Sequence, residues 1–176
     1  MRVPTLDEYS KKYEHIRLTR EDGILQMTLH TDGKDLVWGF PPHQELGYCF
    51  ADVASDPENK VIIFTGSGET FIHKEDLGGG GVTAGLWAEH VLPDAKRLLM
   101  NHLEIQVPMI AAVNGPALGA GCVLTSVCDI RIAAEKATFG LPEINVGRCG
   151  GTAHMGRHLP QGLLRRMFFT GQPITA

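Results

Sequence analysis

PMIAAVNGPALGAGC, residues 108–122, joins a short apolar run to a glycine-rich turn. Residues 109–113 are predicted to form a buried strand, residues 114–116 a turn, and residues 119–128 a helix. The first turn of a helix carries N–H groups without intrahelical partners at the positive end of its dipole, and the glycines here let another group approach them. This stretch therefore predicts a site for an anion or an oxyanion, although tight packing of a helix on a sheet would use the same glycines.

The remaining chain repeats this alternation of strands and helices. Residues 15–19 and 24–31 alternate apolar and polar side chains around Asp22-Gly23, which predicts an antiparallel hairpin. Further strands are predicted at residues 61–64, buried on both faces, and 130–133, and helices at residues 41–53, 87–99 with a kink at Pro93, and 150–170 in two short pieces. Such an order predicts an α/β fold of β–β–α units, which we expect to form a single domain over residues 1–176.

Composition excludes several functional classes. The 176 residues are 43% hydrophobic and 20% charged, and 20 acidic against 16 basic residues give a formal charge of −4, which does not favour a nucleic-acid partner. The polar N-terminus lacks the apolar core of a secretory signal, and no window resembles a membrane span. The four cysteines show no close-paired spacing. We therefore expect a cytoplasmic protein with reduced thiols and no membrane partner.

Two other features of the sequence resemble ligand sites. Cys149, His154 and His158 are candidate metal ligands, but no fourth ligand accompanies them, so we expect no metal site. Residues 78–81 are four consecutive glycines, which predict a mobile loop. They lack the following Lys-Ser/Thr of a phosphate-binding loop, and nucleotide hydrolysis is not supported.

Several motifs follow one another in a fixed order, at residues 71–77, 108–121, 128–131, 137–143, 150–152 and 169–171. Together they resemble the enoyl-CoA hydratase/isomerase signature of the crotonase superfamily over nearly the whole chain. The resemblance implies a spiral of ββα units. Family members generally continue into C-terminal helices that complete the acyl-CoA site and drive trimerisation. Residues 171–173 look like a helix start just before the sequence ends, so we expect a truncated chain lacking that helical segment, and a homotrimer or dimer of trimers at full length.

The resemblance also implies the site residues. The backbone N–H groups of Glu75 and Ala120 would hold the carbonyl oxygen of an acyl-CoA thioester, and Glu143 would act as general acid/base. A carboxylate in a turn is otherwise most often a structural hydrogen-bond acceptor. Coenzyme A enters as part of the substrate, and no separate cofactor is expected. The remaining substrate-binding residues expected are His43, His73, Asp76, Leu77, Gly119, Gly121, Val123 and Gly151.

This chain departs from the signature at three places. Val123 occupies the position of the second glutamate of the hydratases, so a reaction with one carboxylate, such as enoyl isomerisation, is favoured over hydration. The loop at residues 147–151 is shorter than in the family. Residues 72–75 replace the usual small residues of the first oxyanion motif and bring three ionisable side chains to the site.

The N-terminal third carries a second resemblance, at residues 13–18, 36–38, 45–50 and 58–61 and at His43. These residues look like oxocamphor hydrolase, a crotonase relative that cleaves a carbon–carbon bond in β-diketones. His43 matches a substrate-contacting histidine of that enzyme, whereas its base histidine falls at Glu143 and its partnering aspartate near Gly151. Three functions therefore stay open: an acyl-CoA enzyme, a β-diketone hydrolase acting on another small carbonyl substrate, and a non-catalytic or inactive fragment.

Overall fold

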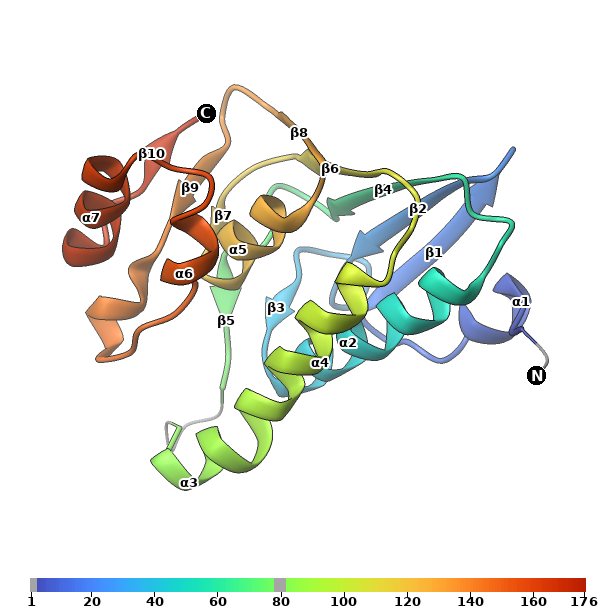
Figure 1. Cartoon of the computed structure of the whole chain (residues 1–176), viewed down its shortest axis with the longest axis horizontal. Coiled ribbons are helices and arrows are strands. Elements are labelled where there is room, and N and C mark those ends of the chain that lie inside the picture. The colour runs from blue at the N-terminus through green and yellow to red at the C-terminus, as the bar shows by residue number, and fades with distance from the viewer. Residues whose placement is uncertain (1–2, 78–81) are drawn as a thin grey trace.

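The structure, a computed structural model, describes residues 3–77 and 82–176, so the four-glycine run at 78–81 lies outside the described residues. Its largest sheet has five strands in the order β1-β2-β4-β6-β8 (Figure 1). The strands are β1 (Ile16–Glu21), β2 (Ile24–Leu29), β4 (Val61–Gly66), β6 (Met109–Val113) and β8 (Ile130–Ala133). β1 and β2 form the predicted antiparallel hairpin, and each later strand is added in parallel. A parallel addition requires a crossover, which the helices provide.

Short strands alternate with the long ones along the chain and run across their direction in Figure 1. They are β3 (Val37–Trp38), β5 (Lys74–Glu75), β7 (Ala117–Leu118), β9 (Thr138–Gly140) and β10 (Ile174–Thr175). Each pair of a long and a short strand is followed by helical structure: α2 (Phe40–Ser55), then α3 (Ala84–Leu86), η1 (Trp87–Val91) and α4 (Leu92–Leu103), then α5 (Ala120–Val127), then η2 (Pro142–Val146). The predicted ββα spiral is confirmed.

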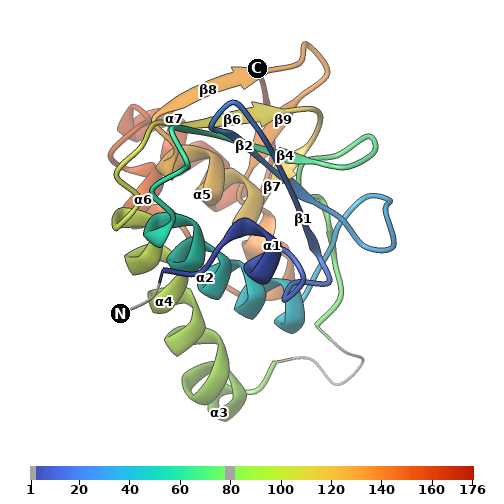
Figure 2. The same ribbon diagram turned by 90° about the vertical axis from the view of Figure 1, so that its right-hand side faces the viewer.

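Helices α2 and α4 cover one face of the five-stranded sheet, as Figure 2 shows. The apolar residues that α2 presents at helical spacing, among them Leu46, Cys49 and Phe50, are fully buried there. The ring of Phe50 packs edge-on against Phe64 of β4, with 6.0 Å between ring centroids. Strand β4 alternates buried and half-buried residues. The prediction of a strand buried on both faces is therefore wrong for one face.

The C-terminal part forms a second, smaller apolar cluster made by α5, α6 (Thr152–Met155), α7 (Gln161–Thr170) and the residue before η2. Its buried members are Cys122, Leu141, Met155, Leu164 and Met167. The two short helices predicted at residues 150–170 are confirmed. The helix expected to start after Pro173 is wrong, because Ile174 and Thr175 instead pair antiparallel with β9. The Gly171 helix end, at φ 63°, turns the chain back towards that strand.

The predicted kink near Pro93 takes a specific form. The five residues Trp87–Val91 form a π-helix that leads directly into α4, in which Pro93 is the second residue. Inside a helix, proline lacks the N–H of one main-chain hydrogen bond and its ring clashes with the preceding turn, and a widened π turn accommodates such an interruption. The widened turn therefore lies N-terminal to the proline, and α4 continues from it to Leu103.

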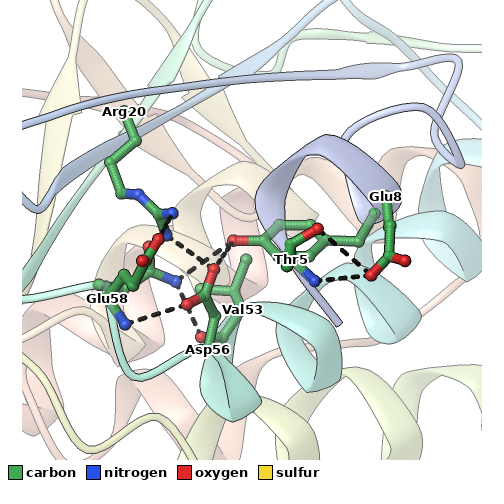
Figure 3. Close-up of polar contacts among 8 residues, drawn as sticks. Thr5, Glu8, Arg20, Val53, Asp56 and Glu58 are labelled. Atoms are coloured by element: carbon green, nitrogen blue, oxygen red, sulfur yellow. Dashed lines mark hydrogen bonds and ion pairs between the residues drawn. The ribbon is translucent and has the colours of Figure 1, made fainter. Parts of the chain in front are cut away.

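A buried polar network ties the N-terminal segment to the end of α2 (Figure 3). The Tyr9 hydroxyl donates to Asp56 Oδ2 at 2.9 Å, and Arg20 Nη1 contacts the same oxygen at 2.7 Å. Arg20 also donates to Asn59, and the backbone N–H of Glu58 donates to Asp56 Oδ1. These hydrogen bonds outweigh the opposing effect of burial and lower the pKa of the Asp56 carboxyl. The network fixes helix α1 (Leu6–Tyr9) against the core.

Asp56→Asn is expected to lower the free energy of unfolding by about 1.5–3 kcal/mol, the size of hydrogen bonds made to a charged group. Because the Asp56 pKa is depressed in the folded chain, its contribution is present above the unfolded pKa and disappears as the pH falls through the folded value. Urea unfolding at several pH values measures both effects. Asp7→Asn, on the exposed side of α1, is the matched control. Equal stability of the two variants at neutral pH would contradict the assignment.

Candidate active site

Three parallel segments of the short-strand layer end beside one another. Residue Ile72 pairs with Ala117 of β7, and the Leu118 N–H donates to the Ile72 carbonyl at 2.8 Å. On the other side of β7, Ala117 pairs with Phe139 of β9. Glu75 and Ala120 each lie three residues after the bridged pair Ile72 and Ala117. The ladder thus delivers the two predicted N–H donors to corresponding positions of neighbouring segments.

The strand pairing sets the direction of the Glu75 N–H. β5 pairs in parallel with β3, and the Asp76 N–H donates to the Trp38 carbonyl at 2.8 Å. Because successive N–H groups of a strand point to opposite sides, the Glu75 N–H points away from β3.

The second donor lies at the start of α5. Gly119 is the N-cap, with φ 55° and ψ −118°, a conformation that favours glycine, and its N–H donates to the Gly140 carbonyl. Ala120 is therefore the first helical residue, whose N–H has no partner within the helix. Gly121 is in close contact with the preceding segment, since a Cβ there would lie 2.8 Å from the Ile72 Cβ.

Both donor positions line a cavity of about 450 Å³. Of the residues predicted from the sequence, it brings together Glu143, Glu75, Ala120, His43, Leu77, Val123 and Gly151. It does not include His73, Asp76, Gly119 or Gly121. His73 and Asp76 are exposed, Gly119 packs near the Glu143 carboxyl, and Gly121 is buried against Ile72. Apolar side chains from three helices complete the wall, among them Trp87, Val91, Leu98, Leu99 and Leu124.

Glu143 lies on η2, directly after Pro142 and three residues after the end of β9. A Cβ on Gly119 would lie 3.4 Å from its Oε1, which places the carboxyl against the start of α5. Its Oε2 is buried and has no hydrogen-bond partner within the described residues. Burial raises the pKa of this carboxyl, Glu75 raises it further, and Arg148 opposes the shift. Such a group is suited to exchange a proton with a bound substrate.

Arg148 is a site residue that the sequence reading missed. Its backbone N–H donates to the Glu143 carbonyl at 2.9 Å, and its Nη1 lies 3.2 Å from both carboxylate oxygens of Glu75. The ion pair joins the loop after η2 to strand β5 in the cavity wall. In the sequence, Arg148 is only one charged residue in a shortened loop. That position does not indicate which residue its side chain contacts.

His43 lies in the cavity wall formed by the start of α2. Its ring packs edge-on against Trp38, with 5.4 Å between centroids, and burial lowers its pKa. Val123, which replaces the expected second carboxylate, is in close contact with Gly151, since a Cβ there would lie 2.4 Å from the Val123 Cγ2. The cavity therefore combines the carboxyl of Glu143 and the ring of His43 with apolar walls.

The candidate metal ligands Cys149, His154 and His158 do not all share the cavity. Cys149 and His154 line the cavity, whereas His158 does not. Another group, Glu14, His15 and Glu45, places its ligand atoms within 4.8 Å of one another. It lies outside the cavity, and the two oxygens of Glu45 already contact the His15 N–H and Nδ1.

Comparison with known proteins identifies the family. Residues 19–176 match the model of the enoyl-CoA hydratase/isomerase family. The chain belongs to this family. It is 33% identical, over 95% of its length, to enoyl-CoA hydratase domain-containing protein 3 of Xenopus laevis, described as mitochondrial. It is 39% identical, over 90% of its length, to 2,3-dehydroadipyl-CoA hydratase of Escherichia coli K12.

Among solved structures of this crotonase fold, one similar chain is a β-diketone hydrolase from Anabaena sp. PCC 7120, bound to (S)-3-oxocyclohexyl acetic acid. It has a TM-score of 0.86 and 32% identity, covering 96% of this chain and 69% of that one. The present chain of 176 residues spans 59% of the length of the Xenopus relative and 63% of that of the E. coli relative. Among the described residues, no helix combines the length and apolar character that crossing a membrane requires.

Proposed function

We propose that this family member acts on an enoyl-CoA thioester through an enolate, with Glu143 as its one general acid/base. The observation that carries the proposal is that the Glu143 carboxyl lies on the same cavity as the main-chain positions Glu75 and Ala120. Two N–H donors aimed at a thioester oxygen would stabilise the negative charge that develops there when a proton leaves the neighbouring carbon.

The proton transfer that fits one carboxylate is a 1,3-shift. The Glu143 carboxylate takes a proton from Cα of a 3-enoyl thioester, and the electron pair of that C–H bond moves through the enolate onto the oxygen held by Glu75 and Ala120. The same carboxyl then returns the proton at Cγ, which gives the 2-enoyl thioester. Val123 supplies no second carboxylate to position an attacking water, so we place isomerisation before hydration.

The test compares 3-enoyl-CoA and 2-enoyl-CoA substrates with this chain and follows both isomerisation and hydration. Isomerase activity that exceeds hydratase activity supports the proposal. Turnover of neither substrate, together with no binding of a saturated acyl-CoA, contradicts it and leaves the non-catalytic alternative.

The pH dependence of that activity is expected to report Glu143. Its carboxyl must be ionised to accept a proton, so kcat/KM should rise with pH through the Glu143 pKa, which burial places above the ordinary value near 4.3. Arg148 lowers this pKa, so Arg148→Gln should move the acidic limb to higher pH. Glu75 raises it, and Glu75→Gln should move the limb to lower pH. Shifts of the same sign in both variants would contradict the assignment.

A second candidate is hydrolysis of a β-diketone, favoured by the position of His43 in the cavity and by the likeness to the Anabaena β-diketone hydrolase. In this reaction water adds to one carbonyl, the carbon–carbon bond breaks, and the released carbanion is held as an enolate before it is protonated. The candidate predicts cleavage of a cyclic 1,3-diketone that is lost in His43→Ala. Affinity for acyl-CoA without diketone cleavage counts against it.

A further inference from the structure

Arg148 and Glu75 form an ion pair on the wall of the cavity in which the thioester is proposed to bind. Both residues line the cavity, yet they belong to segments 73 positions apart in the sequence. Each is also joined to a catalytic position through its own main chain: Arg148 donates its N–H to Glu143, and the N–H of Glu75 is one proposed oxyanion donor. A positive charge at this point bears directly on which acyl groups are accepted.

The contact itself is loose. A single nitrogen, Nη1, meets both oxygens of Glu75 at 3.2 Å, whereas charge-assisted hydrogen bonds of arginine are usually about 2.7–2.9 Å and often two-pronged. The Glu75 side chain is 45% exposed and that of Arg148 is 25% exposed. An ion pair of this exposure contributes little to stability, so a better carboxylate can replace Glu75 at little cost.

We propose that Arg148 selects acyl thioesters that carry a second, terminal carboxylate, which takes the place of the Glu75 side chain on the guanidinium. This inference rests on the proposed acyl-CoA function and names its substrate class. The two ends of the acyl group are then both held, the thioester oxygen by main-chain N–H groups and the far carboxylate by Arg148.

The geometry of Glu75 indicates the length of that acyl group. One glutamate side chain links the N–H proposed to hold the thioester oxygen to the carboxylate that Arg148 holds. A glutaryl chain places a similar number of bonds between its thioester carbonyl and its carboxylate. Lys96 also lines the cavity, from α4, and its variant below tests whether it holds the carboxylate instead.

The experiment measures binding of glutaryl-CoA and pentanoyl-CoA by calorimetry. The two ligands have equal acyl length, and both are saturated, so the measurement does not depend on turnover. Arg148→Gln is expected to lower the ratio of glutaryl to pentanoyl affinity by about 10- to 100-fold, the effect of losing a charged hydrogen-bonded contact. Glu75→Gln removes the competing carboxylate and is expected to raise the same ratio.

Lys96→Gln is the matched control, because Lys96 also lines the cavity but belongs to α4. An equal fall of the ratio in Lys96→Gln would show general attraction by positive charge and would overturn the proposal. An unchanged ratio in Arg148→Gln, including equal weakening of both ligands as for a phosphate contact, would also overturn it. Opposite changes in the Arg148 and Glu75 variants cannot come from misfolding. Absence of pentanoyl-CoA binding instead contradicts the proposed acyl-CoA function.

Discussion

We expect Glu143→Gln to lower kcat for enoyl thioester isomerisation by about 10²- to 10⁴-fold, the range for loss of a general acid/base. The glutamine keeps the size of the side chain and cannot exchange a proton. The structure supplies the reason for a large effect, because Oε2 is buried without a hydrogen-bond partner in the described residues and burial raises the carboxyl pKa. Steady-state kinetics with a 3-enoyl-CoA measure the loss.

The same substitution is not expected to destabilise the fold. Replacing a buried carboxyl, of which Oε2 has no hydrogen-bond partner in the described residues, by a neutral amide removes a desolvation cost, so the thermal midpoint should stay equal or rise. Glu135→Gln, on an exposed turn after β8, serves as the control and should retain wild-type kinetics. Full activity in Glu143→Gln would exclude the proposed proton transfer, whatever the fate of the oxyanion site.

Ala120→Pro is expected to lower kcat/KM by about 10²- to 10³-fold, the effect of removing one oxyanion donor. Ala120 is the first residue of α5, where proline is well tolerated because no helical hydrogen bond is lost. The substitution therefore removes the N–H proposed to bind the thioester oxygen while α5 is kept. Circular dichroism and the thermal midpoint check that the fold is unchanged.

The control for this variant is Ala120→Ser, which changes the side chain and retains the main-chain N–H. It should keep most of the activity, because the proposed donor belongs to the backbone. Similar large losses in the serine and proline variants would mean that the side-chain volume at position 120 matters rather than the N–H. Undiminished activity in the proline variant would remove α5 from the oxyanion site.

Local sequence patterns were sufficient for most of the fold. The Asp22-Gly23 turn, the apolar runs of β4 and β6 and the prolines at the start of α2 each identify an element through short-range physics. The strand Ile174–Thr175 was missed because two residues carry no periodicity, and its pairing with β9 depends on contacts distant in the sequence. The half-buried face of β4 was missed for the same reason, since burial depends on what covers the sheet.

Some residues of the candidate site could be predicted from the sequence and others could not. The resemblance to the family identified Glu75, Ala120 and Glu143, and the structure places all three on one cavity. The pairing of the short strands that brings their segments together was not itself predicted from the sequence. Arg148 could not be predicted, because its partner Glu75 lies on another turn of the spiral and only the folded chain brings the two charges together. The catalytic roles themselves stay predictions until the variants are measured.

The close contact between Gly121 and Ile72 has a consequence for evolution of the site. Since no methyl group fits between them, the main chain of the first turn of α5 and the segment leading to β5 are held at one fixed separation. This separation is set by the contact between Gly121 and Ile72 and does not depend on the side chains at positions 75 and 120. Substitutions at positions 75 and 120 can consequently change the charge of this pocket, as the ionisable Glu75 shows, without changing the separation of the two main-chain segments.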